Sequence, residues 1–401
     1  MSQMNRRQAL QLLAALGTSG LAAGCGSDSE DPAASSGNPI KIGLIVPGTG
    51  PNKVIGEEIS NGFQLFLSLN NHQLGGHPAT VVTAEEGENA KSGQAAVDRL
   101  LKEGVLALTG VVSSAVMLGI RDSVEQARVP LIGSNASPTS LQSVVYIWRT
   151  SYVLDEPGRA LGQYLRETLP ATKRITVIAP DSQSSRDVVD GFRKGYEVNG
   201  RRIAAAPILT ADIANPGKGT YGAAIGQALH QRPDVIFCHY AGPAAVQFVK
   251  QLYDGGYRGP VYAPGFLTEG TVLGELESED ALIEKYGIET ALNYSADLNN
   301  TANRVFASAY RDTYRASPTT YAMASYDAAQ VLDKAIRLVP GNPTSQQVNL
   351  ALGKIGQIDS PRGPWQFNQP RTPQQKWYLR RVQRDGQLLS NVVINELATL
   401  G

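Results

Sequence analysis

Short apolar runs alternate with longer segments of helical period along most of this 401-residue chain, and this rhythm limits the fold more than any other feature. Residues 41–46 (KIGLIV), 105–110 (VLALTG) and 233–240 (PDVIFCHY) are apolar over most of their length, as buried strands are. After the first of these runs, apolar residues such as Ile55 and Ile59 recur at helical spacing. Apolar strands separated by helices predict parallel sheets with helices on both faces.

The alternation of predicted strands and helices forms two successive series along the chain. The first series ends near Arg149 to Asp155, and the second begins with EPGRALGQYLRETL at residues 156–169. We therefore predict an α/β fold with two doubly wound parallel-sheet lobes, joined by a hinge of several strands because the C-terminal helices and strands must return to existing lobes. The predicted lobes are residues 40–151 plus 293–366 for lobe 1, and residues 152–292 plus 367–401 for lobe 2.

The N-terminal segment has the pattern of an export signal that ends at a cysteine. Two arginines precede an apolar stretch, residues 9–24, which is too short to span a bilayer comfortably. Cys25 follows, and then GSDSEDPAASSGNP at residues 26–39, a linker of low hydrophobicity. We predict a signal peptide over residues 1–24, lipidation of Cys25 and a flexible linker that holds the body at a membrane surface. The Sec and twin-arginine export routes both remain open.

Charge and cysteine content exclude several classes of protein. The chain has 36 basic and 36 acidic residues, whereas nucleic-acid binders usually carry a basic excess. The second cysteine, Cys238, lies in an apolar run and has no partner once Cys25 is lipidated. We therefore expect no disulfide, and a buried Cys238 that packs as a small apolar side chain.

Catalytic and metal-binding patterns are lacking in the sequence. His72 and His77 lie in a polar turn without a carboxylate pattern, which favours a solvated loop over a metal site. Neither a GxSxG motif nor a phosphate-binding GxxxxGK[ST] loop occurs. Glu85 and Glu86 follow each other in a strand, so their side chains point to opposite faces. His239 follows a strand and could line a cleft, although a lone histidine there is more often packed. We expect no enzyme activity, no metal and no cofactor.

Polar loops follow several of the predicted strands, where open α/β sheets bind their ligands. Ser113 and Ser114 lie between a strand and a helix, where a serine caps the helix and leaves N–H groups for an anion such as a carboxylate. Residues 133–140 (GSNASPTS) form a similar loop with short hydroxyl and amide side chains. The predicted cleft loops are residues 47–56, 110–116 and 133–140 in lobe 1, and 180–185, 239–242 and 264–270 in lobe 2.

Several motifs, taken in order, resemble those of a known family. They include GVVSSAVMLG at residues 110–119, VPLIGSNASPTS at residues 129–140 and YAMASYDAAQVLDKAI at residues 321–336. From Ile40 to Leu397 the chain resembles type I periplasmic binding proteins, specifically the leucine/isoleucine/valine-binding group that feeds ABC importers. The resemblance implies a solute receptor that closes two lobes over one small molecule and docks on a membrane permease.

The resemblance also implies the residues of the site. In that family, hydroxyls and N–H groups of two first-lobe loops hold the α-carboxylate of the ligand, and a second-lobe tyrosine closes over it. The matching positions are Ser113, Ser114, Asn135, Ala136 and Ser137 in the first lobe and Tyr240 in the second.

Three positions depart from the family pattern. The chain has Ile55 instead of an aromatic residue, Ser184 and Ser185 instead of a Tyr-Gly pair, and Leu267 instead of the ammonium-binding glutamate. Glu269 lies two residues further on and is a candidate substitute. Without an acceptor, the burial of an ammonium costs several kcal/mol. A carboxylate without an amine, or another small polar solute, then becomes the expected ligand.

The expected function is therefore a lipid-anchored, extracytoplasmic solute receptor that delivers a small polar, carboxylate-bearing molecule, either amino-acid-like or amide- or urea-like, to an ABC importer. The alternative is a sensory protein of the same fold that signals to a membrane partner. The expected partners are a small-molecule ligand, the permease and, through the lipid anchor, the outer face of the cytoplasmic membrane.

Overall fold

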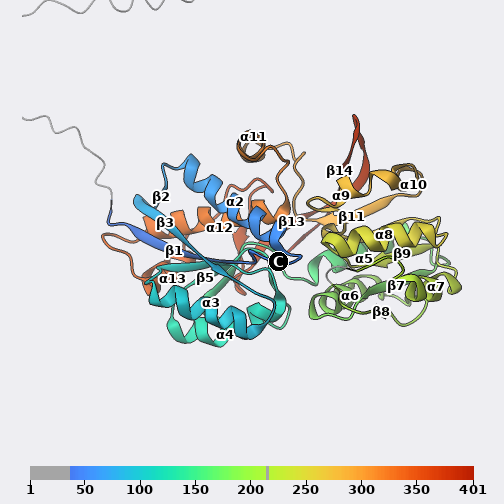
Figure 1. Cartoon of the computed structure of the whole chain (residues 1–401), viewed down its shortest axis with the longest axis horizontal. Coiled ribbons are helices and arrows are strands. Elements are labelled where there is room, and N and C mark those ends of the chain that lie inside the picture. Colours follow the sequence, from blue (N-terminus) through green and yellow to red (C-terminus); the bar gives the residue numbers. More distant parts are fainter. Residues whose placement is uncertain (1–36, 214–215) are drawn as a thin grey trace, which may run out of the picture. The chain divides into compact units, whose positions relative to one another are not determined.

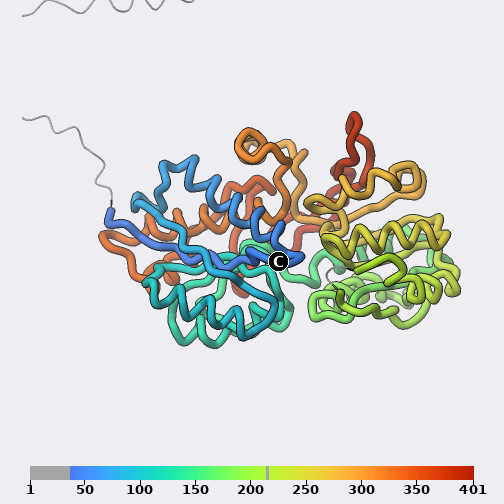
Figure 2. Tube along the Cα trace, viewed as in Figure 1, coloured from blue at the N-terminus to red at the C-terminus, as the bar shows by residue number. Residues whose placement is uncertain are grey.

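The computed structural model describes residues 37–213 and 216–401. The predicted export signal, the predicted lipidation site Cys25 and all but the end of the predicted linker lie outside this part of the chain. Figure 1 labels the helices and strands, and Figure 2 traces the chain through the same view. Among the described residues, no helix combines the length and the apolar character needed to cross a membrane.

The first sheet has six strands in the order β2-β3-β1-β4-β5-β6. All neighbours pair in parallel except β2 and β3, which form a short antiparallel pair. Because the strands are apolar on both faces, both faces are covered by helices, as the sequence predicts. The strands are β1 (Ile40–Val46), β2 (Gln73–Leu74), β3 (His77–Glu85), β4 (Ala107–Gly110), β5 (Leu131–Gly133) and β6 (Ile147–Arg149).

Strand alternation assigns the two faces of the first sheet to different helices. Ile42 packs against α2 (Lys53–Leu69), α12 (Thr320–Arg337) and α13 (Ser345–Leu352). Ile45 packs in a separate cluster with α3 (Ala90–Lys102) and α4 (Ser114–Ala127) on the other face. A short helix-flanked sheet of this kind places the C-terminal strand ends at one common edge.

The second sheet follows the order β12-β13-β11-β10-β9-β7-β8, with β14 paired to β13. Strands β7 to β11 pair in parallel. Strand β13 pairs with β11 in the antiparallel direction, and β14 forms a hairpin with β13. Residues 363–387 predict a strand, a proline-rich turn and a final strand that ends in a hairpin. In the structure the proline-rich turn joins β12 to β13, and the hairpin turn follows β13. The strands are β7 (Ile175–Pro180), β8 (Ile208–Thr210), β9 (Val235–Cys238), β10 (Val261–Pro264), β11 (Ile288–Leu292), β12 (Gln366–Phe367), β13 (Pro373–Asp385) and β14 (Leu388–Leu400).

Helices also cover both faces of the second sheet. Phe237 and its neighbours face α5 (Glu156–Thr168) and α6 (Gln183–Tyr196), and Cys238 faces α7 (Gly222–His230) and α8 (Gly242–Asp254). Cys238 is fully buried, as the sequence predicts. Short helical turns, η1 (Gly265–Thr268), α9 (Val272–Glu275), η2 (Glu277–Glu279) and α10 (Asp280–Tyr286), follow β10, and α11 (Thr301–Tyr314) follows β11.

A buried arginine joins the segments that cross between the two sheets. The Arg362 guanidinium forms an ion pair with Asp327 of α12 at 2.5 Å, and both side chains are almost completely buried. It also donates to the carbonyls of Thr150 and Ser151, which lie between β6 and α5, and to Gln375 of β13. The network therefore ties the crossing segments together, although the Oδ1 atom of Asp327 is buried without a partner among the described residues.

Candidate functional site

The first-lobe rim is formed by the loops after β3, β4 and β5. Val111 adopts a left-handed conformation (φ 68°), which turns the chain sharply from β4 toward α4. Ser113 is the N-cap of α4, and its Oγ accepts a hydrogen bond from the Val116 N–H at 3.4 Å. The helix therefore begins at the strand edge as the sequence predicts, with its positive end facing the rim.

Glu86 occupies part of this helix N-terminus. Its carboxylate accepts the N–H groups of Val112 and Ser113, both at 2.7 Å, and the side chain has no exposed surface. Burial raises the pKa of Glu86 to about 7, although the two N–H donors oppose that shift. We expected N–H groups at this helix start to be free for a ligand. The chain's own carboxylate binds two of them, which leaves the amides of Ser114 and Ala115 as the open donors of α4.

The loop after β5 lies against the same helix start. Asn135 donates its side-chain amide to the Val112 carbonyl at 3.0 Å, and the Ala136 N–H donates to the Val111 carbonyl at 2.9 Å. Ser137 is fully buried, and its Oγ has no hydrogen-bond partner within residues 37–213 and 216–401. The structure thus brings the first-lobe residues of the predicted site together, with one enclosed hydroxyl that has no partner in this part of the chain.

Four aromatic rings, those of Tyr152, His239, Phe266 and Tyr321, form a cluster. The Phe266 ring is parallel to that of Tyr321, with centroids 5.6 Å apart, and stacks on Tyr152 at 5.8 Å. The His239 ring lies 6.3 Å from Phe266. Tyr152 is buried, and its hydroxyl has no partner among the residues described. The four rings come from different elements, so sequence spacing alone does not identify the cluster.

Glu269 is engaged in a buried ion pair. One of its oxygens contacts the Arg380 guanidinium at 2.6 Å, and the other accepts the Thr320 N–H at 3.0 Å. Glu269 and Arg380 are both almost fully buried. The pair joins the loop after η1 to the start of α12 and to β13. Both oxygens of Glu269 therefore already accept hydrogen bonds within the chain, whereas the sequence suggested a free acceptor.

Tyr240, which the resemblance predicts to close over the ligand, is a buried residue of the second lobe. Its side chain is 2 % exposed and packs in the core on the α7 and α8 side of the second sheet. Its hydroxyl lies 3.1 Å from Thr210 Oγ1, and its ring stacks on Phe248 at 4.1 Å. Leu267 belongs to the same core. The second-lobe residue that reaches the aromatic cluster is instead its neighbour, His239.

A clasp connects the two lobes beside these groups. The Thr139 N–H donates to Asp187 Oδ2 at 3.0 Å, and the Thr139 hydroxyl donates to Oδ1 at 2.7 Å. Thr139 follows Ser137 by two residues, and Asp187 lies on α6 in the second lobe. The clasp therefore connects the first-lobe rim to the second lobe.

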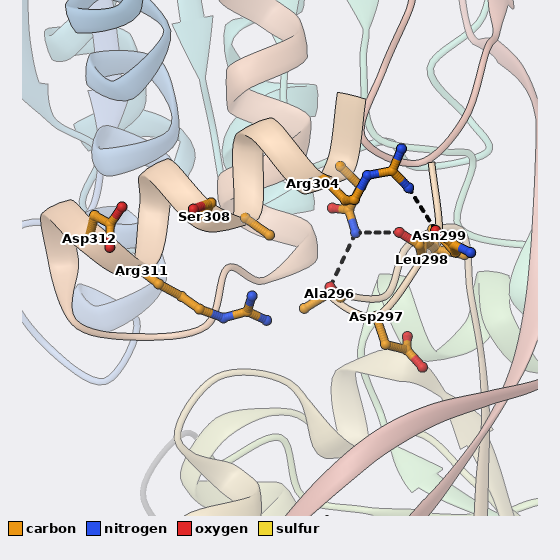
Figure 3. A pocket seen from close by; sticks show the side chains of 10 residues that line it. Ala296, Asp297, Leu298, Asn299, Arg304, Ser308, Arg311 and Asp312 are labelled. Carbon is orange, nitrogen blue, oxygen red and sulfur yellow. Dashed lines mark hydrogen bonds between the residues drawn. The ribbon is translucent and has the colours of Figure 1, made fainter. Parts of the chain in front are cut away.

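A surface cavity of about 380 Å³ lies elsewhere, between α11 and the loop before it (Figure 3). Asn303 closes its base by donating to the carbonyls of Ala296 and Leu298, and Arg304 binds Asn299 at 2.7 Å. These polar groups satisfy one another, and the cavity contains none of the residues predicted to bind a ligand. Among the residues described, no group of three or more His, Cys, Asp or Glu side chains could hold a metal ion.

Comparisons with known proteins agree with this architecture. A family model described as periplasmic binding protein matches residues 39–387, so the chain belongs to that family. The Leu/Ile/Val-binding protein homolog 6 of Brucella melitensis is 23% identical over 356 residues, which cover 86% of this chain and 87% of that protein. These matches confirm the resemblance stated from the motifs.

Solved structures confirm the type I fold with two α/β lobes. A solute-binding protein of an ABC transporter from R. palustris, solved in complex with benzoate, has a TM-score of 0.79 and 25% identity and covers 90% of this chain and 97% of its own. A leucine-binding protein from Thermotoga maritima has a TM-score of 0.77 and 20% identity, with coverage of 89% and 99%.

Proposed function

We propose that this periplasmic binding protein is the solute receptor of an ABC importer and that it binds a small carboxylate with an apolar or aromatic body and no ammonium group. The similar R. palustris protein is described as an ABC transporter component and holds benzoate, which is such a molecule. Relatives named for leucine, isoleucine and valine binding support the same receptor role. A receptor of this kind binds and releases its solute unchanged, which agrees with the absence of a catalytic motif in the sequence.

The observation that carries the proposal is the unpartnered hydroxyl of Ser137, which follows Ala136, the residue that binds the turn before α4. A buried polar atom without a partner is costly, so this hydroxyl supports a ligand group that completes it. A carboxylate suits this position because helix N-termini favour anions. The rings of Phe266 and Tyr321 then supply apolar surface for the rest of the ligand.

The ion pair of Glu269 supports the exclusion of amino acids. An ammonium that enters this site loses its water, and Glu269 already neutralises Arg380 and accepts from Thr320. An unpaired buried charge is strongly unfavourable. We therefore extend the proposal to ligands that have the carboxylate of an amino acid without its amine.

A calorimetric panel on the mature protein tests the ligand class. We expect benzoate to bind, and benzamide, which has the same ring and no charge, to bind at least tenfold more weakly, because it loses the charge-assisted hydrogen bonds. Urea serves as a small amide control without a ring. Equal affinity for benzoate and benzamide would contradict the carboxylate subsite.

We also propose that the chain is exported and anchored through Cys25 to the outer face of the cytoplasmic membrane, where it meets its permease. The sequence pattern supports this: an apolar segment and small residues precede Cys25, and a polar linker follows it. Replacement Cys25→Ser should move the protein from the membrane fraction to the soluble fraction. The matched control is Cys238→Ala, which should stay with the membrane because Cys238 is a core residue. Membrane retention of Cys25→Ser would refute the anchor.

A further inference from the structure

His239 follows β9 and reaches the N-terminus of α6. Its Nδ1 lies 2.9 Å from the Ser185 hydroxyl, and both side chains are buried. Val235 and Phe237 face α5 and α6, and His239 continues their alternation, whereas Cys238 and Tyr240 face the opposite side. This register explains why the histidine, and not the tyrosine beside it, meets the junction of the lobes.

A chain of serine hydroxyls determines which ring nitrogen carries the proton. Ser182 donates its hydroxyl to Ser185 at 3.0 Å, and the Ser184 hydroxyl lies 3.1 Å from Ser182. A serine hydroxyl has a single proton, so Ser185 accepts from Ser182 and directs its own proton to Nδ1 of His239. A neutral histidine that accepts at Nδ1 carries its proton on Nε2.

The Nε2–H of His239 is thus an open donor. The part of the chain that the structure describes offers it no hydrogen-bond partner. The unpartnered hydroxyls of Ser137 and Tyr152 are fully enclosed by the chain. The Nε2 atom of His239 differs from them in that it keeps some exposed surface. Burial lowers the pKa of His239 to about 4, which keeps the ring neutral near pH 7. The ring stands 6.3 Å from Phe266 in the aromatic cluster.

We propose that His239 is a specificity-determining residue that donates Nε2–H to an oxygen of the ligand at the end remote from its carboxylate. This inference rests on the proposed function, because it concerns the other end of the same solute. First-lobe groups take the carboxylate, and His239 from the second lobe selects ligands with a hydroxyl or carbonyl oxygen beyond the ring. A site built to hydrogen-bond a polar group discriminates strongly against the analogue that lacks it.

Calorimetry with benzoate and 4-hydroxybenzoate tests the specificity. Wild type should bind 4-hydroxybenzoate at least tenfold more tightly than benzoate. The variant His239→Phe should keep its affinity for benzoate within about threefold and lose the preference. The control His230→Gln changes an exposed histidine and should retain the preference. A preference that survives in a folded His239→Phe variant, or that is missing from wild type, overturns the inference.

Nuclear magnetic resonance of protein labelled with ¹⁵N-histidine tests the donor without any ligand. We expect His239, identified by the signal lost in His239→Gln, to be the neutral Nε2–H tautomer at pH 7. An Nδ1–H tautomer or a protonated ring would overturn the donor assignment. Failure of wild type to bind any carboxylate of the panel would refute the proposed function, whereas carboxylate binding without a His239-dependent preference would refute this inference alone.

Discussion

The two sides of the lobe junction hold a buried glutamate in different ways. On the first-lobe rim, the Glu86 carboxylate is bound by two backbone N–H groups, and no cation pairs with it in the described structure. On the second-lobe side, Glu269 is paired with Arg380 and an N–H group. The first arrangement leaves a helix end that still favours an anion, and the second is already neutral. We propose from this comparison that the first-lobe rim recognises charge, whereas His239 of the second lobe recognises a polar substituent.

Removal of the charge on Glu269 should give the largest effect. Glu269→Gln leaves the buried Arg380 guanidinium without its counter-ion, so we expect the free energy of unfolding to fall by about 3–5 kcal/mol. Urea denaturation followed by circular dichroism measures it. The double variant Glu269→Gln with Arg380→Met should recover much of the loss, because no unpaired charge remains buried.

The matched control is Glu289→Gln, which removes a carboxylate 3.7 Å from the half-exposed Arg381. Such pairs contribute about 1 kcal/mol or less. If Glu269→Gln costs no more than this control, Glu269 is not held by the pair, and it becomes available to a ligand ammonium.

The charge of Glu86 should appear as a pH dependence of stability. Its folded pKa of about 7 lies above the ordinary value of 4.5, so between these values the folded state holds a proton that the unfolded state releases. The contribution of Glu86 to stability therefore falls as pH rises from about 4.5 to 7. Glu86→Gln should lack this decline, and its stability relative to wild type should rise by up to about 3 kcal/mol between pH 5 and 8.

The exposed neighbour Glu88 provides the comparison for this measurement. Glu88→Gln should follow the wild-type pH profile within about 0.5 kcal/mol. Parallel pH profiles of stability for wild type and Glu86→Gln would contradict this prediction. They would show that the two backbone donors stabilise the ionised Glu86 carboxylate as well as Arg380 stabilises that of Glu269, and the contrast between the two sides would disappear.

The first-lobe part of the site was predictable because its signals are local. Ser113 precedes a helix and follows an apolar strand, and Ser137 lies in a loop after another, so position in the strand–helix pattern is enough. The same pattern predicted the two lobes. Glu86 was overlooked because its partners, the amides of Val112 and Ser113, belong to a loop that only the order of β3, β1 and β4 brings near.

The second-lobe part depends on contacts that sequence spacing does not reveal. Glu269 and Arg380 are 111 residues apart, and no sequence pattern near Glu269 predicts an arginine partner. The choice of His239 rather than Tyr240 as the candidate, however, could have been made from the sequence. Val235 and Phe237 lie on one face of β9, and the period of two then places His239 with them. Which face meets α6 is decided by the tertiary structure.

Removal of the first-lobe hydroxyls should separate ligand binding from helix capping. Ser137→Ala deletes the unpartnered Oγ, so affinity for benzoate should fall more than tenfold, the effect of a lost hydrogen bond to a charged group of about 1.5–3 kcal/mol. Ser113→Ala removes a cap that binds Val116, so it should cost about 1 kcal/mol of stability with less than threefold loss of affinity. Calorimetry and thermal melts measure the two quantities separately.

Ser140→Ala, an exposed change in the same loop, should alter neither affinity nor stability. Unchanged benzoate affinity in both Ser113→Ala and Ser137→Ala would restrict these serines to structural roles, and the first lobe would then recognise charge through backbone amides alone.

Leucine and 4-methylpentanoate provide the finest comparison of the two sides, since they share a side chain and a carboxylate and differ only in the ammonium. The first-lobe rim should treat them alike. Near Glu269 the ammonium meets a carboxylate that already neutralises Arg380, and Leu267 offers it no acceptor. We therefore expect leucine, isoleucine and valine to bind with dissociation constants weaker than about 100 μM, and 4-methylpentanoate to bind at least tenfold more tightly than leucine. Calorimetry on the mature protein measures both. Micromolar leucine binding that is lost in a folded Glu269→Gln variant would show that the glutamate exchanges Arg380 for the ligand, which would restore the amino-acid assignment.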